Sequence, residues 1–365
     1  MKSMRAIIFQ VIIIGGLNGC YLQNSQTSAP VIFPVSQPIS QSNIKDGRGR
    51  FYSEFLRQLS RCDCSKSAAE AWIEPAPLPK LLPTSSSDSH LSVKASSTAV
   101  FIIPGIFWDC VGMAAIPYAD PSHEGYGKGH IYGYLSDLGF NRIEPIMVSG
   151  RASSEVNSEL IAEKIKHEAQ KKYIKHIIIL GYSKGVPDTL TALAALDPET
   201  RKKIKSFVSL SGVGLGTPIA GKLNNLYKAL EGSASICPNS RGEEVKSLTY
   251  EDRLRWWETA IYDSTIKYYS VVSVSSLLTT APVLIPFKAA LDPLNPANDG
   301  QVLASDAILP SSTLLAIVKS DHWSYTLPLQ KSNSIFDKII SVKADFPREA
   351  FIRSVLGIVL EDIEY

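Results

Sequence analysis

The sequence has no large excess of charge of either sign. Its 37 lysines and arginines nearly balance 35 aspartates and glutamates, which leaves a formal net charge of +2 over 365 residues. A net charge this small produces no field that attracts a polyanion, and no basic run with interleaved aromatic residues appears. We therefore expect no nucleic-acid partner. A hydrophobic content of 45% is instead typical of a globular protein with a substantial core.

The N-terminus lacks an apolar run long enough to cross a bilayer. Its apolar stretch, residues 6–16, follows Lys2 and Arg5 and precedes Leu-Asn-Gly-Cys at residues 17–20. A basic start, a short apolar stretch and then a site with a small residue is the order of a secretion signal. The four residues at its end resemble the lipobox of bacterial lipoproteins, in which the cysteine becomes the acylated first residue.

That resemblance implies a leader over residues 1–19 and a lipid on Cys20. Tyr21 and Leu22 follow, where an aspartate would resemble an inner-membrane retention signal. We therefore expect a lipid-anchored protein of the cell envelope, held in the outer membrane and facing the periplasm if the source is Gram-negative. An ordinary cleaved signal with an unrelated cysteine is the alternative.

Cysteine is scarce, with 5 in the chain. Apart from Cys20 they are Cys62, Cys64, Cys110 and Cys237, an even number in a compartment that permits disulfides. A bond from Cys62 or Cys64 to one of the other two would fasten the N-terminal region to the rest of the chain, and the pairing stays open. Cys-x-Cys lacks the wider spacing of zinc ligands, so no metal site is expected.

The segment before the main domain is rich in proline and serine. Residues 23–43 contain mostly Ser, Gln and Pro with little charge, so we expect residues 20–47 to be a lipidated cysteine followed by a flexible tether. Residues 48–97 follow as an N-terminal arm, with a second Pro- and Ser-rich stretch at residues 75–97. Residues 50–61 predict a short docking helix, because apolar residues recur there at helical spacing. These are Phe51, Phe55, Leu56 and Leu59.

Residues 98–365 alternate apolar runs of strand length with amphipathic stretches. This pattern predicts one α/β domain with a doubly wound, mostly parallel sheet that helices cover on both faces. The expected strands are residues 99–104, 142–148, 176–181, 206–211, 267–274 and 314–319. The expected helices are residues 130–138, 154–172, 184–196 and 348–361.

A strand, a sharp turn and a helix meet at Gly181-Tyr182-Ser183-Lys184-Gly185. Gly-x-Ser-x-Gly in this context is typical of a nucleophile elbow, because the turn lifts the serine hydroxyl out of the sheet in front of a helix N-terminus. A turn that binds a nucleotide is the alternative, but neither Gly-x-Gly-x-x-Gly nor a phosphate-loop lysine accompanies it. Ser183 is therefore the predicted nucleophile.

The elbow and the sequence Phe-Ile-Ile-Pro-Gly-Ile at residues 101–106 together resemble the α/β-hydrolase superfamily, in its lipase and esterase branch. Residues 209–220, Ser-Leu-Ser-Gly-Val-Gly-Leu-Gly-Thr-Pro-Ile-Ala, are similar to the strand and loop that follow the elbow helix in many lipases. The resemblance covers roughly residues 98–340. It implies the α/β-hydrolase fold and serine hydrolase chemistry that needs no metal or organic cofactor.

His322 is the predicted general base. In this superfamily the triad follows the chain order serine, acid, histidine, and of the 6 histidines His322 alone follows Ser183. It lies on a loop directly after the last expected strand, which is where a base bonded to the serine should lie.

Asp299 is the predicted acid. Residues 298–302, Asn-Asp-Gly-Gln-Val, resemble the Asp-Gly-x-Val segment that bears the acid in many lipases. Asp321 adjoins His322, but consecutive side chains diverge and seldom make the bond that orients the imidazole. The further alternatives are Asp292 and Asp306.

A tetrahedral intermediate needs backbone N–H donors for its oxyanion. The residue after the nucleophile, Lys184, is the first expected donor. Family position implies Ile106 as the second, with Phe107 as the alternative, because Pro104-Gly105 stands where many lipases have His-Gly.

Residues 107–129 and 221–265 are longer than connections within the sheet require. Inserts at the carboxyl edge of the strands build the substrate pocket in this fold, so we expect a helical cap insert over roughly residues 217–265. Its Tyr227, Trp256 and Trp257 suit an apolar acyl group and equally suit ordinary helix packing.

The expected function is hydrolysis of a carboxylic ester, from a lipid or another acyl ester, through an acyl-enzyme on Ser183. An acyltransferase would use the same residues with an alcohol in place of water, and a peptidase could use the same triad. A lipid-anchored binding scaffold without catalysis is the alternative from another class. The order of serine, acid and histidine in the chain argues against that last alternative.

Overall fold

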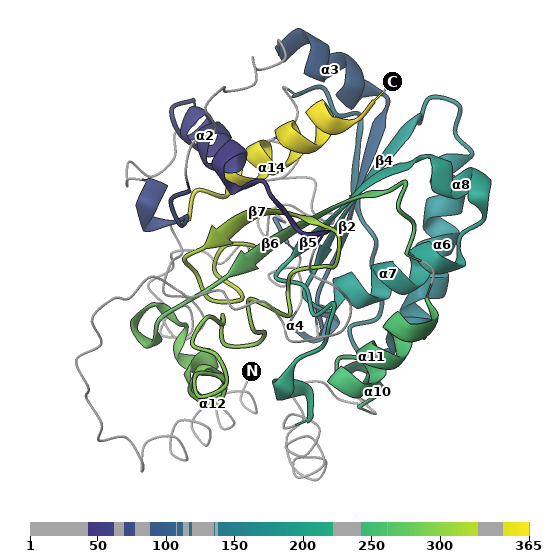
Figure 1. Cartoon of the computed structure of the whole chain (residues 1–365). Coiled ribbons are helices and arrows are strands. Elements are labelled where there is room, and N and C mark those ends of the chain that lie inside the picture. Colours follow the sequence, from purple (N-terminus) through teal and green to yellow (C-terminus); the bar gives the residue numbers. More distant parts are fainter. Residues whose placement is uncertain are drawn as a thin grey trace.

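The structure is a computed structural model, shown in Figure 1. It describes residues 43–61, 69–76, 88–106, 108–111, 117–118, 135, 138–221, 242–260, 262–327 and 346–364. Outside these residues lie the predicted leader at 1–19, Cys20, the tether up to residue 42, Phe107, most of the helix at 130–138, and Tyr227. Cys62, Cys64, Cys237 and the side chain of Cys110 lie outside them as well.

A sheet of 7 parallel strands forms the centre of the domain, with the order β1-β7-β6-β5-β4-β2-β3. The strands are β1 (Lys45–Asp46), β2 (Thr98–Ile103), β3 (Arg142–Pro145), β4 (His176–Tyr182), β5 (Ile204–Leu210), β6 (Lys267–Ser273) and β7 (Thr313–Val318). Since β4 lies between β2 and β5, the residues that follow these three strands meet at one edge of the sheet.

Helices cover both faces of the sheet (Figure 1). On one face lie α2 (Arg48–Leu59), α3 (Asp88–Ser96) and α14 (Arg348–Asp362). On the other lie α6 (Ser154–Ala169), α7 (Gly185–Ala195) and α8 (Pro198–Lys202). The shorter helices are α4 (Trp108–Val111), α10 (Glu243–Lys246), α11 (Tyr250–Thr259) and α12 (Ile285–Leu291). None of the described helices is long and apolar enough to cross a membrane.

The strand β4 shows why the sheet is buried on both faces. Its sequence, His-Ile-Ile-Ile-Leu-Gly-Tyr, is buried at every position. Ile178 and Leu180 join the hydrophobic cluster that contains residues of α2 and α14, whereas Ile177 and Ile179 join the cluster that contains residues of α6 and α7. Alternate side chains therefore pack against different helical layers. The predicted doubly wound parallel α/β fold is confirmed.

Each expected strand has a counterpart, and the one predicted at 142–148 ends at Pro145. Proline has no backbone N–H for the ladder, and it is tolerated here because β3 lies at the edge of the sheet.

Two elements differ from the expectation. The last residues of the predicted tether form β1, in which Lys45 and Asp46 pair with β7. Helix α3 occupies part of the Pro- and Ser-rich stretch at 75–97, where the sequence predicted no helix. The physical reason is the same in both places: a two-residue strand and a nine-residue polar helix have little apolar periodicity, and packing on the domain stabilises them.

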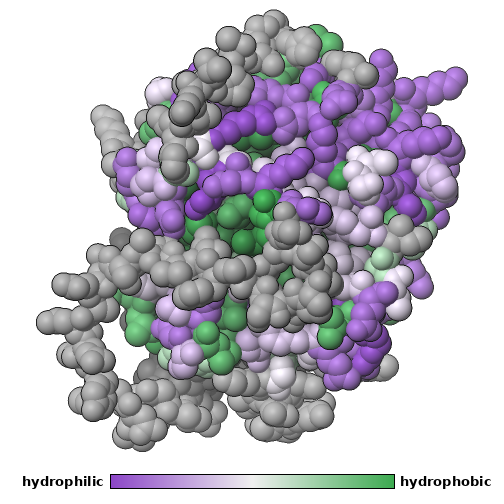
Figure 2. Space-filling model, in the orientation of Figure 1, coloured by the Kyte–Doolittle hydropathy of each residue, from purple (hydrophilic) through white to green (hydrophobic). Residues whose placement is uncertain are grey.

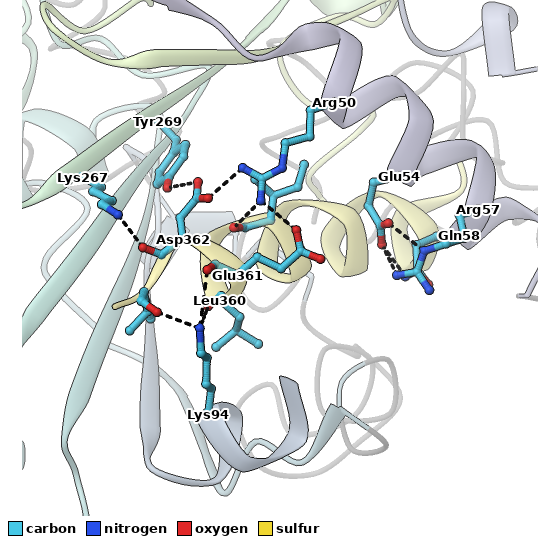
Figure 3. Close-up of polar contacts among 12 residues, drawn as sticks. Arg50, Glu54, Arg57, Gln58, Lys94, Lys267, Tyr269, Leu360, Glu361 and Asp362 are labelled. Carbon is cyan, nitrogen blue, oxygen red and sulfur yellow. Dashed lines mark hydrogen bonds and ion pairs between the residues drawn. The ribbon is translucent and has the colours of Figure 1, made fainter. Parts of the chain in front are cut away.

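Helix α2 is the predicted docking helix of the N-terminal arm. Phe51 and Phe55 are fully buried, and the Phe51 ring packs edge-on against Phe351 of α14 with 5.5 Å between centroids. Figure 3 shows that Arg50 also forms ion pairs of 2.7 Å with both Glu361 and Asp362, near the C-terminal end of α14. The arm is therefore part of one helical layer.

Lys94 of α3 holds the same end of α14. Its buried ammonium group donates hydrogen bonds to the carbonyl oxygens of Leu360 at 3.2 Å and Ile363 at 2.7 Å (Figure 3). A cation is favourable there because the last carbonyl groups of a helix carry partial negative charge.

Candidate active site

Ser183 occupies the sharp turn between β4 and α7. Its φ angle is 52°, in the left-handed region that non-glycine residues rarely adopt. Such a conformation costs about 1–3 kcal/mol and persists where neighbouring contacts hold it. Here the N–H of Ser183 donates to the carbonyl of Leu210 at 3.1 Å, and the carbonyl of Ser183 accepts from Val186 at 3.1 Å and Val213 at 3.2 Å. The turn therefore has the geometry expected of a nucleophile elbow.

The glycines on either side of the turn are required by their neighbours. A Cβ atom at Gly185 would lie 2.4 Å from the carbonyl oxygen of Ile103, and one at Gly181 would lie 2.9 Å from the ring of Phe207. Any side chain at Gly185 would therefore push β2 away from the turn.

His322 lies against Ser183 on the loop after β7. Its Nε2 atom is 2.9 Å from the Oγ atom of Ser183, and its Nδ1 atom is 2.8 Å from the Oδ2 atom of Asp299. The carbonyl oxygen of His322 also accepts a 2.9 Å hydrogen bond from the hydroxyl of Tyr182. All of these side chains are at least nine-tenths buried. The structure thus brings the predicted nucleophile, base and acid into one hydrogen-bonded line.

The carboxylate of Asp299 accepts hydrogen bonds on both oxygens. Oδ1 accepts from the backbone N–H groups of Gln301 and Val302, each at 2.9 Å, and Oδ2 accepts from Ser273 at 2.7 Å as well as from His322. Burial by itself raises the pKa of this carboxyl, but the charge and hydrogen bonds of His322 and the other donors outweigh it. The pKa of Asp299 therefore lies below its ordinary value, and the side chain is a carboxylate at neutral pH.

The alternative acids have other partners. Asp321 accepts from the N–H groups of Trp323 and Ser324 through Oδ1, and from that of Ala281 through Oδ2 at 2.8 Å. It therefore shapes the loop that bears His322. Burial raises the pKa of this carboxyl above its ordinary value.

Asp292 and Asp306 are occupied in a similar way. Asp292 accepts from Lys288 at 2.6 Å and from Asn298 at 3.0 Å, while Asp306 accepts from the hydroxyl of Tyr250. Among the described residues, Asp299 is the one carboxylate bonded to the imidazole of His322.

The expected oxyanion donors lie on two segments that meet at Ser183. A Cβ atom at Gly105 would lie 3.1 Å from the Cβ of Ser183, so the chain that leads to Ile106 passes directly against the predicted nucleophile. Within the described part of the chain, the backbone N–H groups of Ile106 and Lys184 have no backbone acceptor. No backbone carbonyl of the described residues therefore competes with a substrate oxygen for these two donors.

The side chain of Lys184 has a role that the sequence analysis missed. It is 1% exposed, and its ammonium group bonds both carboxylate oxygens of Asp188 at 2.7 and 2.8 Å. Asp188 accepts further hydrogen bonds from Ser154 and Asn157 of α6. This buried ion pair joins α6 to α7 through Lys184, the residue whose backbone N–H is an expected oxyanion donor. The spacing of Lys184 and Asp188, four residues apart on one helix face, was the available signal.

The aromatic residues of the expected cap pack as parts of a helix. Trp256 and Trp257 of α11 are partly buried against the cluster that contains α6 and α7, and the Trp257 indole N–H donates to the carbonyl of Gly214 at 2.9 Å. These contacts favour helix packing for the two tryptophans.

No group of three or more potential metal ligands occurs among the residues that the structure describes.

These residues lie in an α/β-hydrolase fold, and the solved structures that the chain resembles are carboxyl esterases and lipases. A metagenomic carboxyl esterase, MGS0156, superposes with a TM-score of 0.75 at 26% identity, over 91% of this chain and 97% of its own. EstA from Clostridium botulinum gives a TM-score of 0.48 at 12% identity, over 86% and 98% of the two chains. The fold assignment rests on the first of these, whose score is the higher. No protein-family model and no curated protein matches the sequence.

Proposed function

We propose that this protein is a serine hydrolase that cleaves carboxylic esters through an acyl-enzyme on Ser183. One observation carries the proposal: the Oγ atom of Ser183 is 2.9 Å from Nε2 of His322, whose Nδ1 atom is 2.8 Å from Asp299. These distances are those of a nucleophile, its general base and the carboxylate that orients the base.

The proposed reaction has two halves. In the first, His322 takes the hydroxyl proton of Ser183 as its Oγ atom bonds to the ester carbonyl carbon, and the imidazolium then gives that proton to the departing alcohol. In the second, His322 takes a proton from water, whose oxygen attacks the acyl-enzyme, and returns a proton to Ser183 as the acid leaves. Asp299 holds the imidazole with Nδ1 protonated throughout.

The backbone N–H groups of Ile106 and Lys184 would hold the oxyanion of each tetrahedral intermediate. This role is supported by their place on either side of Ser183 and by their lack of a backbone acceptor among the described residues. A donor of this kind contributes about 2.7–4 kcal/mol of transition-state stabilisation.

An apolar ester is the proposed substrate class. The chain between β6 and Asp299 has exposed apolar side chains, including Leu278 at 90%, Leu294 at 60% and Leu277 at 48% exposure. Figure 2 shows hydrophobic residues at the surface in the region of α12. The one basic residue between β6 and Asp299 is Lys288, and its side chain is buried, so residues 274–298 expose no cation.

We also propose that a lipid on Cys20 anchors the protein to a membrane of the cell envelope. The support is the order of basic residues, apolar stretch and Leu-Asn-Gly-Cys in the first part of the sequence. Such an anchor would hold the hydrolase near lipid esters.

The test is hydrolysis of p-nitrophenyl esters from acetyl to palmitoyl by the purified protein, beside Ser183→Ala and His322→Ala. We expect activity that both substitutions abolish, and stoichiometric labelling of the wild-type serine by a fluorophosphonate. Folded protein that neither hydrolyses any ester nor takes up the label would overturn the proposal in favour of a binding scaffold. Labelling without ester hydrolysis would favour a peptidase or an acyltransferase.

A further inference from the structure

A chain of hydroxyl groups extends from the carboxylate of Asp299 away from His322. The Ser273 hydroxyl bonds Oδ2 of Asp299 at 2.7 Å, and the Ser211 hydroxyl bonds that of Ser273 at 2.6 Å. The phenol of Tyr325 bonds the Ser211 hydroxyl at 2.8 Å. The reaction described above makes no use of these three side chains.

The fold brings the three hydroxyl groups of this hydrogen-bonded chain together. Ser273 is the last residue of β6 and Ser211 directly follows β5, so the neighbouring carboxyl ends of two paired strands bring them together. Tyr325 lies three residues after His322, on the same loop. The line from His322 through Asp299 and the hydroxyl groups therefore returns to the loop that bears His322.

All three hydroxyl residues are shielded from water. Ser211 and Tyr325 are 0% exposed and Ser273 is 1% exposed. Ser211 also has a left-handed φ of 44°, even though its N–H remains bonded to the carbonyl of Val271 at 2.9 Å. A strained backbone at a buried serine persists where side-chain contacts hold it. The hydrogen bonds to Ser273 and Tyr325 are such contacts.

An ionised Asp299 sets the direction of every hydrogen bond in this chain. A carboxylate can only accept, so the Ser273 hydroxyl must donate its proton to Asp299. The oxygen of Ser273 then accepts from Ser211, and that of Ser211 accepts from Tyr325. Aligned hydroxyl groups polarise one another, which strengthens the donor that faces the carboxylate.

We propose that Ser273 is a positioning residue for the acid of the triad, and that Ser211 and Tyr325 align its hydroxyl toward Asp299. This inference rests on the proposed function. Ser273 and His322 share the Oδ2 atom, while the partners of Oδ1 among the described residues are backbone N–H groups. Ser273 thereby determines both where Oδ2 lies and how much of its charge bears on the imidazole.

The pH dependence of kcat/KM shows how strongly the charge of the Asp299 carboxylate acts on His322. Removing the Ser273 hydroxyl leaves His322 as the one donor to Oδ2 among the described residues, so more of the carboxylate charge faces the imidazole and its protonated form gains stabilisation. Because His322 must be neutral to act as a base, the acid limb of kcat/KM moves to higher pH. A merely structural effect of the same substitution would lower the amount of active protein and leave the limb in place.

Several elements place other titratable groups near the Asp299–His322 pair. Those around Asp299 and His322 are Tyr182 of β4, Asp321 and Tyr325 of the His322 loop, and Tyr118, with Arg348 of α14 beside Tyr118. Burial raises the pKa of each of these tyrosines far above its ordinary value, so they stay neutral between pH 4 and 9. Asp321 shares no hydrogen bond with Ser273 among the described residues. Its titration is therefore common to wild type and variants.

The experiment compares Ser273→Ala, Ser273→Thr and Ser270→Ala with the wild type in the full-length protein. Ser270 is the matched control, because it is a fully buried serine of the same strand whose hydroxyl bonds Ser312 and the N–H of Leu309, away from the triad. The substrate is p-nitrophenyl butyrate, with released p-nitrophenol read after an alkaline quench from pH 4 to 9. Thermal unfolding of each variant is measured in parallel.

For Ser273→Ala we expect the acid limb to move upward by about half a pH unit and kcat to fall about tenfold, equivalent to about 1.4 kcal/mol. Ser273→Thr keeps the hydroxyl and should restore the wild-type limb. Ser270→Ala should keep both the limb and kcat. If the acid limb of Ser273→Ala stays at the wild-type pH, or if Ser270→Ala moves the limb by the same amount, the inference is overturned. The proposed function would fail separately, because the wild type itself would then show no activity that depends on Ser183.

Discussion

His322 and Asp299 are joined twice. The imidazole Nδ1 lies 2.8 Å from the carboxylate, and the backbone N–H of His322 donates to the carbonyl oxygen of Asp299 at 3.0 Å. The second bond fixes the two loops relative to each other, so the first does not depend on side-chain rotamers alone. The proposed base and acid are thereby held in place before substrate binds.

Asp299→Asn should lower kcat on the order of a thousandfold to ten-thousandfold, because an amide no longer holds the imidazole in the required tautomer or stabilises the imidazolium. Steady-state hydrolysis of p-nitrophenyl butyrate measures the loss. Asp321→Asn is the comparison, since Asp321 contacts backbone N–H groups rather than the imidazole. A larger loss in Asp321→Asn than in Asp299→Asn would show that Asp299 is not the acid of the triad.

Stability should depend on pH through Asp299. Its pKa in the folded protein lies below the ordinary 3.8, so ionised Asp299 contributes stability that is fully present above pH 3.8. That contribution is lost as the pH falls through the folded pKa. Urea unfolding at pH 7, 5 and 3 should therefore show a wild-type advantage over Asp299→Asn at pH 7 and 5 that shrinks at pH 3. An advantage already lost at pH 5 would contradict the lowered pKa.

Gly185→Ala should disrupt the elbow, because the added Cβ atom would lie 2.4 Å from the carbonyl oxygen of Ile103 and 2.7 Å from that of Pro104. Neither backbone atom can move without shifting β2, so we expect a loss of about 3 kcal/mol in the free energy of unfolding. Gly221→Ala is the matched control, since its Cβ atom would meet no atom of the described residues within 4 Å. Thermal unfolding that ranks the two variants equally would refute the packing argument.

Phe55→Ala should cost about 3–5 kcal/mol of stability, because the ring is fully buried between α2 and the domain. Leu56→Ala, on the same helix but 42% exposed, should cost less than about 1 kcal/mol. Urea denaturation measures both. A small loss in Phe55→Ala would show that the N-terminal arm does not contribute to the folded domain.

Cys20→Ser should release the protein from the membrane fraction of the cells that produce it. The proposed acyl group is attached to the thiol, and serine offers no thiol. Fractionation with an antibody to the chain, together with mass spectrometry of the N-terminal peptide, detects the change. Wild-type protein without acyl mass on Cys20 would leave the alternative of an ordinary cleaved signal.

Much of the catalytic arrangement was predictable because it is local in the chain or follows its order. The strand, turn and helix around Ser183 are encoded by an apolar run and two glycines that the turn requires. His322 was predicted because the superfamily that the sequence resembles places the histidine after the serine, and no other histidine comes after Ser183. Alternating apolar runs and amphipathic stretches likewise predicted the parallel sheet, because burial on both faces demands such runs.

Resemblance favoured Asp299 as the acid but left Asp321, Asp292 and Asp306 as alternatives, and only the fold shows which carboxylate contacts His322. Asp321 and Asp299 are both near His322, and only the tertiary structure shows that the side chain of Asp321 turns toward backbone N–H groups while Asp299 meets the imidazole. The hydroxyl groups of Ser211 and Ser273 had no sequence signal at all. They lie 62 positions apart and meet because the carboxyl ends of paired parallel strands are neighbours in space. Contacts between distant segments are set by the register of the sheet, which one strand's sequence does not contain.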